Sequence, residues 1–257
     1  MVTPGGVIVM IREWDATVYD ALPLPHLRWG RRTLDRLALT GDETVLEAGC
    51  GTGRDTAELL DRLPRGRVIA VDGSARMLDR LRSKLADRLD RADVVQADLT
   101  RPLPITEPAD AAFSVATFHW IHDHDVLFAN IARALRPGAP FVADCGGRGN
   151  VARVRAAVEK VTGETSETWH FADPEETRRR LERAGFTDVR AALVPDPARL
   201  EPGGQFETYL ATVVLGAHLD RLPPSEHRAF VRAVAAELPE PVVDYVRLEF
   251  SARRAGG

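Results

Sequence analysis

The chain has 257 residues, enough for one large α/β domain with additions or for two small domains, and its 44% hydrophobic content excludes general disorder. Its net charge is −4, so the overall electrostatic field of the protein does not favour binding of nucleic acid or of an anionic membrane. Cys50 and Cys145 form no disulfide framework and have no metal-ligand spacing, and no apolar stretch approaches the roughly 20 residues that cross a bilayer. We therefore expect a cytoplasmic protein with a small-molecule partner.

Short apolar runs alternate with longer amphipathic ones from Thr44 to Cys145, a βαβ pattern typical of a parallel sheet covered by helices. Residues 10–40, before this region, are expected to form an N-terminal helical cap, and Met10 is an alternative to Met1 as the start codon. Five strands are predicted, at Thr44–Ala48, Arg67–Val71, Asp93–Gln96, Ala109–Val115 and Pro140–Cys145. The helices predicted between them are Asp55–Leu63, Ser74–Leu89 with Ser74 as its N-cap, and Asp125–Leu135.

The pattern of short apolar and longer amphipathic runs changes after residue 146. Helices are predicted at Asp173–Ala184, Gln205–Leu219 and Ser225–Leu238, and strands at Thr187–Val194 and Val242–Phe250. In the last run Val246, Leu248 and Phe250 alternate with polar residues, which is typical of a strand near a sheet edge. Residues 195–204 are rich in Pro and Gly and predict a loop into a helical lid insertion at residues 195–240. One domain over residues 1–257 results, with seven strands and a cofactor-binding core at residues 42–146.

Three alternating glycines, Gly49, Gly51 and Gly53, stand where a predicted strand ends and a helix begins. Glycine permits positive φ there and lets a ligand approach the backbone beside the free N–H groups of the helix N-terminus. Asp72 ends the next strand about 20 residues later, where a carboxylate accepts hydrogen bonds from ribose hydroxyls. Asp98 ends the strand after that and can accept one from an adenine amine. A structural turn explains the glycines alone, but the three features together predict an adenosine-containing cofactor.

The spacing of residues within the glycine loop distinguishes between NAD and S-adenosylmethionine (SAM) as the expected cofactor. The dinucleotide fingerprint requires G-x-G-x-x-G or G-x-G-x-x-A. Arg54 occupies the third small position when the count starts at Gly49, and Thr56 occupies it when the count starts at Gly51. The fingerprint fails in both registers, which counts against a nicotinamide cofactor.

The segment Glu47-Ala48-Gly49-Cys50-Gly51-Thr52-Gly53 resembles the E/D-x-G-x-G-x-G motif of class I SAM-dependent methyltransferases. Val71-Asp72-Gly73-Ser74 with Met77, Ala97-Asp98-Leu99 and Leu135-Arg136-Pro137-Gly138-Ala139 resemble their later motifs, so the likeness covers residues 42–146. It implies their Rossmann-like fold, a doubly wound α/β architecture with a seven-stranded, mostly parallel sheet, an antiparallel last strand and helical lid additions. It also implies SAM as cofactor and S-adenosyl-L-homocysteine (SAH) as product.

The same resemblance implies a role for each matching position. Glu47 and the glycine backbone would hold the methionine moiety, with Ala116 facing it, while Asp72 would bind the ribose and Asp98 the adenine amine. Met77 and Leu99 would flank the ring, although both could equally be ordinary core residues. The cofactor-binding residues implied in this way are Glu47, Gly49, Cys50, Gly51, Gly53, Asp72, Gly73, Met77, Asp98, Leu99 and Ala116.

Three further segments, Trp14–Asp20, Phe118–Trp120 and Asp244–Leu248, resemble the trans-aconitate and juvenile hormone acid methyltransferase group, whose members methylate small carboxylic acids. Methyl transfer is an in-line displacement, so positioning is the main source of catalysis. A carboxylate with a pKa near 4 is already anionic at pH 7 and needs no general base, whereas a phenol, amine or carbon acceptor would. His119 is the candidate for such a base or for a group that orients the substrate.

A metal cluster is suggested by the residues His119, His122, Asp123, His124 and Asp125, which lie close together in the sequence. However, these residues lie at the start of a predicted helix, where acidic side chains serve as N-caps. We therefore expect no metal. An anionic acceptor would favour an arginine fork in an aromatic cavity, for which Arg28 and Arg148 are candidates. The predicted substrate-binding residues are Trp14, Tyr19, Arg28, His119, Trp120, Arg148, Trp169 and Tyr209.

The sequence therefore predicts a SAM-dependent methyltransferase that acts on a small anionic molecule by O-methylation of a carboxylate. C-methylation of a small isoprenoid such as a prenyl diphosphate, or of another secondary metabolite, is the nearest enzymatic alternative. A SAM-binding sensor without turnover and a NAD-dependent oxidoreductase are the alternatives from other classes. We expect a monomer or homodimer with no nucleic-acid or membrane partner.

Overall fold

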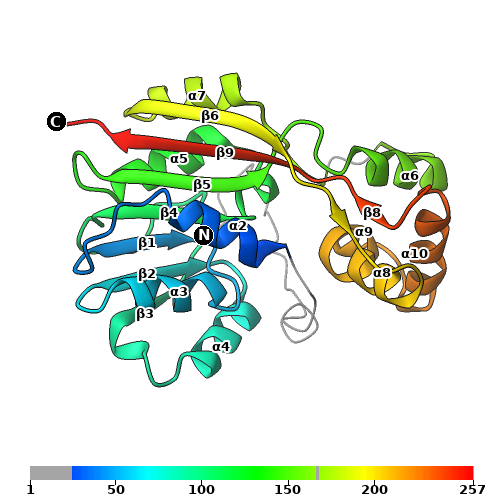
Figure 1. The fold of residues 1–257 in the computed structure, drawn as a ribbon, viewed down its shortest axis with the longest axis horizontal. Helices are drawn as coiled ribbons and strands as arrows, with labels where there is room; N and C mark the ends of the chain where they lie inside the picture. The colour runs from blue at the N-terminus through cyan, green and yellow to red at the C-terminus, as the bar shows by residue number, and fades with distance from the viewer. Residues whose placement is uncertain (1–24, 166–167, 257) are drawn as a thin grey trace, which may run out of the picture.

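A computed structural model describes residues 25–165 and 168–256 of the chain (Figure 1). The strands of its main sheet are β1 (Thr44–Ala48), β2 (Arg67–Asp72), β3 (Ala92–Gln96), β4 (Ala111–Val115), β5 (Pro140–Gly146), β6 (Phe186–Pro195) and β9 (Val246–Arg254). The helices are α2 (His26–Leu34), α3 (Arg54–Arg62), α4 (Ala75–Lys84), α5 (His124–Arg133), α6 (Ala152–Thr162), α7 (Pro174–Arg183), α8 (Gly204–Tyr209), α9 (Gly216–Leu219) and α10 (His227–Ala236). Among these described helices, none has the length and hydropathy that crossing a bilayer requires.

The main sheet has the strand order β3-β2-β1-β4-β5-β9-β6. The strands β1 to β5 run parallel to one another, and β9 is antiparallel to both of its neighbours, β5 and β6. β1 and β4 are almost wholly buried, as expected for strands that are covered on both faces. The predicted fold class, a doubly wound seven-stranded sheet with an antiparallel last strand, is confirmed.

Helices cover both faces of this sheet (Figure 1). On one face α2, α3 and α4 pack in a core that includes Trp29, Leu59 and Leu78, and on the other α5 and α7 bury Phe128 and Leu181. The predicted N-cap of α4 is confirmed, because Ser74 Oγ accepts a hydrogen bond from the Met77 N–H at 3.2 Å. The predicted helix Ser74–Leu89 is too long, since α4 ends at Lys84.

A separate helical unit lies beside the carboxyl ends of the parallel strands, on the right of Figure 1. It contains α8, α9 and α10, within the stretch predicted as a lid, together with a π-helical turn at Leu210–Val214. It also contains α6, which the sequence pattern does not predict and which packs against α10. A small antiparallel pair, β7 (Ala198–Arg199) and β8 (Val242–Val243), connects this unit to the main sheet.

The prediction for the last strand is correct in its place but not in its bounds. The run Val242–Phe250 is divided into β8 and β9, and β9 is the second strand from one edge of the main sheet, as expected for a strand near a sheet edge. The polar residues that alternate along it do not face water, because the Arg247 side chain is buried against Asp144. The alternation therefore reflects buried ion pairs and not a solvent-exposed face.

Candidate functional site

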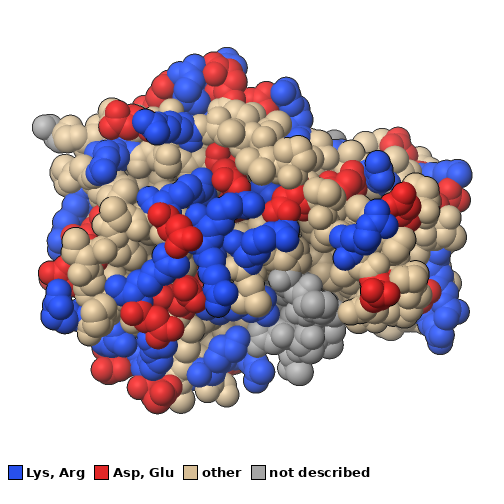
Figure 2. Space-filling model, viewed as in Figure 1, with Lys and Arg blue, Asp and Glu red and all other residues tan. Residues whose placement is uncertain are grey.

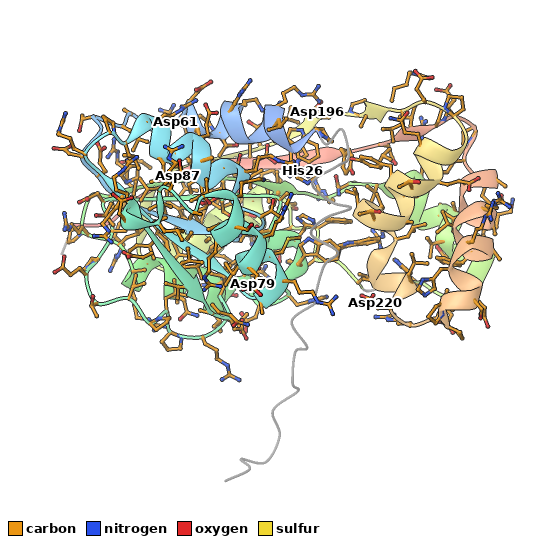
Figure 3. The ribbon with its side chains drawn as sticks, turned by 90° about the horizontal axis from the view of Figure 1, so that it is seen from below. His26, Asp61, Asp79, Asp87, Asp196 and Asp220 are labelled. Carbon is orange, nitrogen blue, oxygen red and sulfur yellow. The ribbon has the colours of Figure 1, made fainter. Side chains whose placement is uncertain are left out.

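A cavity of about 730 Å³ lies at the carboxyl edge of the sheet, where the helical unit faces it. The segments that follow β1, β2, β3 and β4 line it on the sheet side, and Val213, Val214, Ala217 and Arg221 line it from the helical unit. His26, which also lines it, is labelled between these two parts of the molecule in Figure 3. Because the strands stand in the order β3-β2-β1-β4, their ends present polar groups along the cavity in that sequence.

The glycine loop forms part of the cavity wall with its backbone. Gly49 has a φ of 86°, and its N–H and that of Cys50 donate to Val71 O at 2.8 and 3.0 Å, which fixes the loop against β2. A Cβ at Gly49 would lie 2.0 Å from Thr117 Oγ1, so only glycine fits there. A Cβ at Gly51 would meet no atom within 4 Å, so this glycine leaves the backbone open to the cavity.

Two carboxylates stand on the cavity wall beside this loop. The Asp72 Oδ2 accepts a hydrogen bond from the Gly51 N–H, and its Oδ1 accepts one from the Ser74 N–H, each at 2.9 Å. A carboxylate has about four acceptor positions, so Asp72 can also accept from ligand hydroxyls. The Asp98 Oδ1 accepts from the backbone N–H and hydroxyl of Thr100, and no described residue donates to its Oδ2. These groups have the chemistry that ribose and adenine require.

Most of the predicted cofactor residues meet in this cavity. Those that line it are Gly49, Gly51, Asp72, Gly73, Met77, Asp98, Leu99 and Ala116. Their acceptors, open backbone and apolar side chains fit an adenosine-containing ligand such as SAM.

The other three predicted cofactor residues, Glu47, Cys50 and Gly53, do not line the cavity. Glu47 is 2% exposed and its Oε2 accepts a hydrogen bond from the Thr56 hydroxyl at 2.6 Å. Burial raises the pKa of this carboxyl well above its ordinary value. The Glu47 side chain therefore supports the glycine loop from the side that faces away from the cavity. A Cβ at Gly53 would lie 2.6 Å from Leu81, so this glycine allows α3 and α4 to pack closely.

Beyond β4 the chain turns sharply into the other half of the cavity. Ala116 has a φ of 57°, a left-handed conformation that is uncommon for a residue other than glycine, and its N–H donates to Asp144 O at 2.7 Å. Backbone strain of this kind is concentrated at functional sites. The turn brings His119, Trp120 and Ile121 to the cavity wall.

His119 is held as a neutral hydrogen-bond donor. Its Nδ1 accepts a hydrogen bond from the Gly146 N–H at 3.3 Å, so the proton of the neutral ring sits on Nε2. Burial lowers the pKa of the ring well below 6.5, and the nearby charge of Arg247 lowers it further. With Nδ1 engaged and Nε2 protonated, His119 is suited to orienting a ligand and not to accepting a proton.

We expect substitution of His119 by glutamine, which retains an N–H donor, to change kcat by less than about tenfold, since a neutral hydrogen bond contributes about 0.5–1.5 kcal/mol. Loss of a general base would instead cost roughly 10²- to 10⁴-fold. Because a ring with a lowered pKa stays neutral, kcat of the wild type should also not fall as the pH drops through 6.5. A pH profile of both proteins checks this, and a fall centred near 6.5 that is absent in His119→Gln would establish a base.

The structure separates the predicted substrate residues into two groups. Trp120 and Trp169 line the cavity with His119, whereas Arg28, Arg148 and Tyr209 do not. Arg28 pairs with Asp196, and Arg148, whose side chain is 69% exposed, lies 3.0 Å from Asp173 Oδ2. In this structure a carboxylate holds each of these arginine side chains outside the cavity.

Tyr209 is buried in the helical unit, and its hydroxyl lies 2.8 Å from the Tyr245 hydroxyl. It supports Tyr245, which lines the cavity, and does not line the cavity itself. Trp14 and Tyr19 lie outside the described residues.

An arginine in the cavity is supplied instead by β9. Arg247 lines the cavity, is 1% exposed, and has its guanidinium carbon 3.7 Å from the centroid of the Trp29 ring. Its Nε donates to Asp144 Oδ1 at 2.7 Å. Tyr245, two residues earlier, also faces the cavity, and burial raises the pKa of its hydroxyl to about 12. Arg247 has little to mark it in the sequence, because it is one of several polar residues that alternate along β9.

The three histidines near the start of α5 do not converge on one point. The His124 Nε2 lies 2.9 Å from Phe118 O, and its ring contacts His170, whereas His122 lines the cavity. Within residues 25–165 and 168–256, no group of three or more His, Cys, Asp or Glu side chains is placed to hold a metal ion.

Part of the sequence matches known proteins. Residues 45–138 match the model of the methyltransferase domain family. Over 125 residues, 49% of this chain, the sequence is 38% identical to a trans-aconitate 2-methyltransferase of Azoarcus sp. (strain BH72), of which the match covers 47%. The chain thus matches about half the length of such curated relatives.

Solved structures share the fold over most of the chain. The cyclase SpnF superposes with a TM-score of 0.63 at 19% identity, covering 90% of this chain and 82% of that one. The geranyl diphosphate C-methyltransferase of Streptomyces coelicolor A3(2), solved with Mg²⁺, geranyl diphosphate and SAH, has a TM-score of 0.57 at 17% identity, covering 89% and 79%. The chain therefore has the class I methyltransferase fold. Residues 45–138 of it match the methyltransferase domain family.

Proposed function

We propose that the protein transfers the methyl group of SAM to a small anionic acceptor by O-methylation of a carboxylate. The observation that carries this proposal is that a single continuous cavity has two chemically different ends. Asp72 and Asp98 stand at one end with the open glycine backbone, and aromatic rings surround the buried Arg247 at the other. SAM would supply an electrophilic methyl group on a sulfonium.

The strand order supports an order of binding along the cavity. Asp98 follows β3, Asp72 ends β2 and Gly49 follows β1, so adenine, ribose and methionine would lie against successive strand ends. The methyl group would then lie near Ala116, which follows β4. The space beyond, between His119, Trp169 and Tyr245, is left for the acceptor.

The residues of this far half would act by positioning and by excluding water. The His119 Nε2–H can donate to one acceptor oxygen, while a second oxygen keeps a lone pair directed at the methyl carbon, in line with the bond to sulfur. Trp169 and Phe171 stack with their centroids 5.6 Å apart and form an apolar wall. A carboxylate is ionised at pH 7, so no proton has to be removed. The resemblance to trans-aconitate 2-methyltransferases also favours a carboxylate acceptor.

Transfer of labelled methyl from SAM to a panel of carboxylates, phenols, amines and prenyl diphosphates tests this function. We expect label in a carboxylate product that mild alkali releases as methanol, because only an ester is cleaved in that way. Alkali-stable label on a prenyl diphosphate would contradict O-methylation and favour the C-methyl alternative. SAM binding with no transfer to any acceptor would favour a sensor.

A further inference from the structure

We propose that the side-chain amide of Asn150 binds the reacting carboxylate together with His119, and that both N–H groups donate to the oxygen that is not methylated. This inference rests on the proposed function and assigns a further residue that orients the reacting group. It is carried by the way the Asn150 amide is fixed, by the open donor on its nitrogen and by its place beside Gly146.

The Asn150 amide has one fixed orientation in the cavity wall. Its side chain is 97% enclosed, since the residue is only 3% exposed, and it lines the cavity. Its Oδ1 accepts a hydrogen bond from the Val246 N–H at 2.9 Å. The amide cannot be reversed, because an NH₂ group has no lone pair to offer to that N–H. Its Nδ2 donates to no residue that the structure describes, so a donor is left for a ligand in the cavity.

Hydrogen bonds on both sides of Asn150 also hold the backbone that carries it. The Gly147 N–H donates to Val246 O at 2.9 Å, and the Val151 N–H donates to Asp244 O at 3.0 Å. These bonds tie the loop after β5 to the start of β9. They hold Val151 at a φ of 47°, which is a strained conformation for a β-branched residue. Such strain persists only where the surrounding structure enforces it, and it is concentrated at ligand sites.

Gly146 brings the Asn150 amide and the His119 ring to the same part of the cavity. Gly146 is the last residue of β5, and its N–H donates to His119 Nδ1 at 3.3 Å. A Cβ on Gly146 would lie 2.7 Å from Asn150 Nδ2 and 2.7 Å from Phe171 Cε1, so only glycine leaves room for both side chains. The His119 and Phe171 rings stack with their centroids 6.0 Å apart. Two neutral N–H donors, on His119 Nε2 and Asn150 Nδ2, therefore border the space left for the acceptor.

The chemistry of the transfer assigns both donors to the oxygen that does not react. A carboxylate oxygen has two lone pairs, so it can accept from both N–H groups at once, while the other oxygen keeps its own lone pairs for the methyl carbon. As that other oxygen bonds to the methyl carbon, the carbon–sulfur bond breaks and its electron pair passes to sulfur. The first oxygen becomes the carbonyl of the ester and still accepts from both donors. The two donors therefore hold the plane of the carboxylate in line with the sulfur before and during the transfer.

Substitution Asn150→Asp tests this assignment, because it keeps the oxygen that accepts from Val246 and exchanges only the nitrogen. At pH 8 the new carboxylate has no donor and repels the acceptor. The carboxylates of the panel, with acetate, benzoate, succinate and citrate among them, are titrated calorimetrically into SAH-saturated protein. We expect the variant to bind them roughly 10- to 100-fold more weakly, with unchanged affinity for SAH. In the transfer assay KM should rise by the same factor while kcat changes by less than about tenfold, because both donors act before and during the transfer.

A pH profile of the same variant separates a lost donor from a lost support. As the pH falls, the introduced carboxyl gains a proton and becomes an O–H donor, and burial beside an anion raises its pKa above the usual value of about 3.9. The ratio of the dissociation constants of variant and wild type should therefore fall between about pH 8 and about pH 5.5. The titratable and charged groups around this side chain are His119, Asp244, Tyr245 and Arg247. All four are present in the wild type as well, so the ratio reports the introduced carboxyl.

Arg148→Gln is the matched control, because it alters an exposed arginine of the same loop that lies outside the cavity. Figure 2 shows basic and acidic side chains interleaved on one face of the molecule, so the loss of one exposed arginine changes the overall field little. This variant should change neither the binding of carboxylates nor its pH dependence. If Asn150→Asp does not fold, Asn150→Ala introduces no charge and should weaken carboxylate binding without recovery at low pH.

The assignment is overturned if no carboxylate of the panel binds the SAH-saturated wild type, or if a folded Asn150 variant binds it as tightly as the wild type. A ratio for Asn150→Asp that does not vary with pH would overturn it as well, since a structural defect behaves in that way. Carboxylate binding that depends on Asn150, without methyl transfer, would refute the proposed reaction alone. Transfer by Asn150→Asp with the KM of the wild type would refute this inference alone.

Discussion

Substitution of Asp144 by alanine is expected to lower the free energy of unfolding by about 3–5 kcal/mol, because it leaves a buried charge without its partner. The Asp144 carboxylate is wholly buried between Arg247 and Arg32, and the Arg247 side chain is almost completely enclosed. Arg247 would lose the acceptor of its Nε hydrogen bond and could not reach water. Equilibrium unfolding in urea of the variant and the wild type measures the difference.

The control removes both charges at once. Asp144→Leu combined with Arg247→Met leaves no unpaired ion and is expected to lie much closer to the wild type, since replacing a whole buried pair by apolar residues is often neutral. A double variant as unstable as Asp144→Ala would contradict the view that the unpaired charge is the cause.

Substitution of Asp72 by alanine is expected to weaken SAH binding by about 1–3 kcal/mol, the scale of hydrogen bonds to a charged group. Asp72 stands on the cavity wall, and its carboxylate also accepts from the Gly51 N–H, so the variant loses both the proposed acceptor for ribose and a support of the glycine loop. Calorimetric titration with SAH measures the loss. Asp79→Ala is the control, because Asp79 is a 77% exposed carboxylate on α4 (Figure 3). Unchanged affinity in Asp72→Ala would refute the ribose assignment.

The half of the cavity beside the glycine loop could be predicted from the sequence because each of its groups follows its own strand. Parallel strands bring their carboxyl ends to one edge, so Gly49, Asp72 and Asp98 meet there whatever the details of packing. The exception is Glu47, which lies one residue inside the end of β1 and whose side chain turns away from the cavity toward Thr56. Strand position alone does not determine which way a side chain points.

The acceptor half could be predicted only in part, because its residues come from segments far apart in the sequence. Trp29 comes from α2, His119 from the turn after β4, and Arg247 from β9. Arg148 follows β5 directly and has the right place in the sequence, but its side chain reaches outward to Asp173. Arg247 stands in an alternating strand that is typical of a sheet edge, and only the strand order reveals that its polar side is buried.

Calorimetric titration of the purified protein with SAH and with NAD tests most directly whether the cavity holds SAM. The Asp72 and Asp98 carboxylates and the open Gly51 backbone predict binding of SAH at one site and no binding of NAD. Tight binding of NAD with no binding of SAH would contradict the assignment of this cavity to a methyl donor.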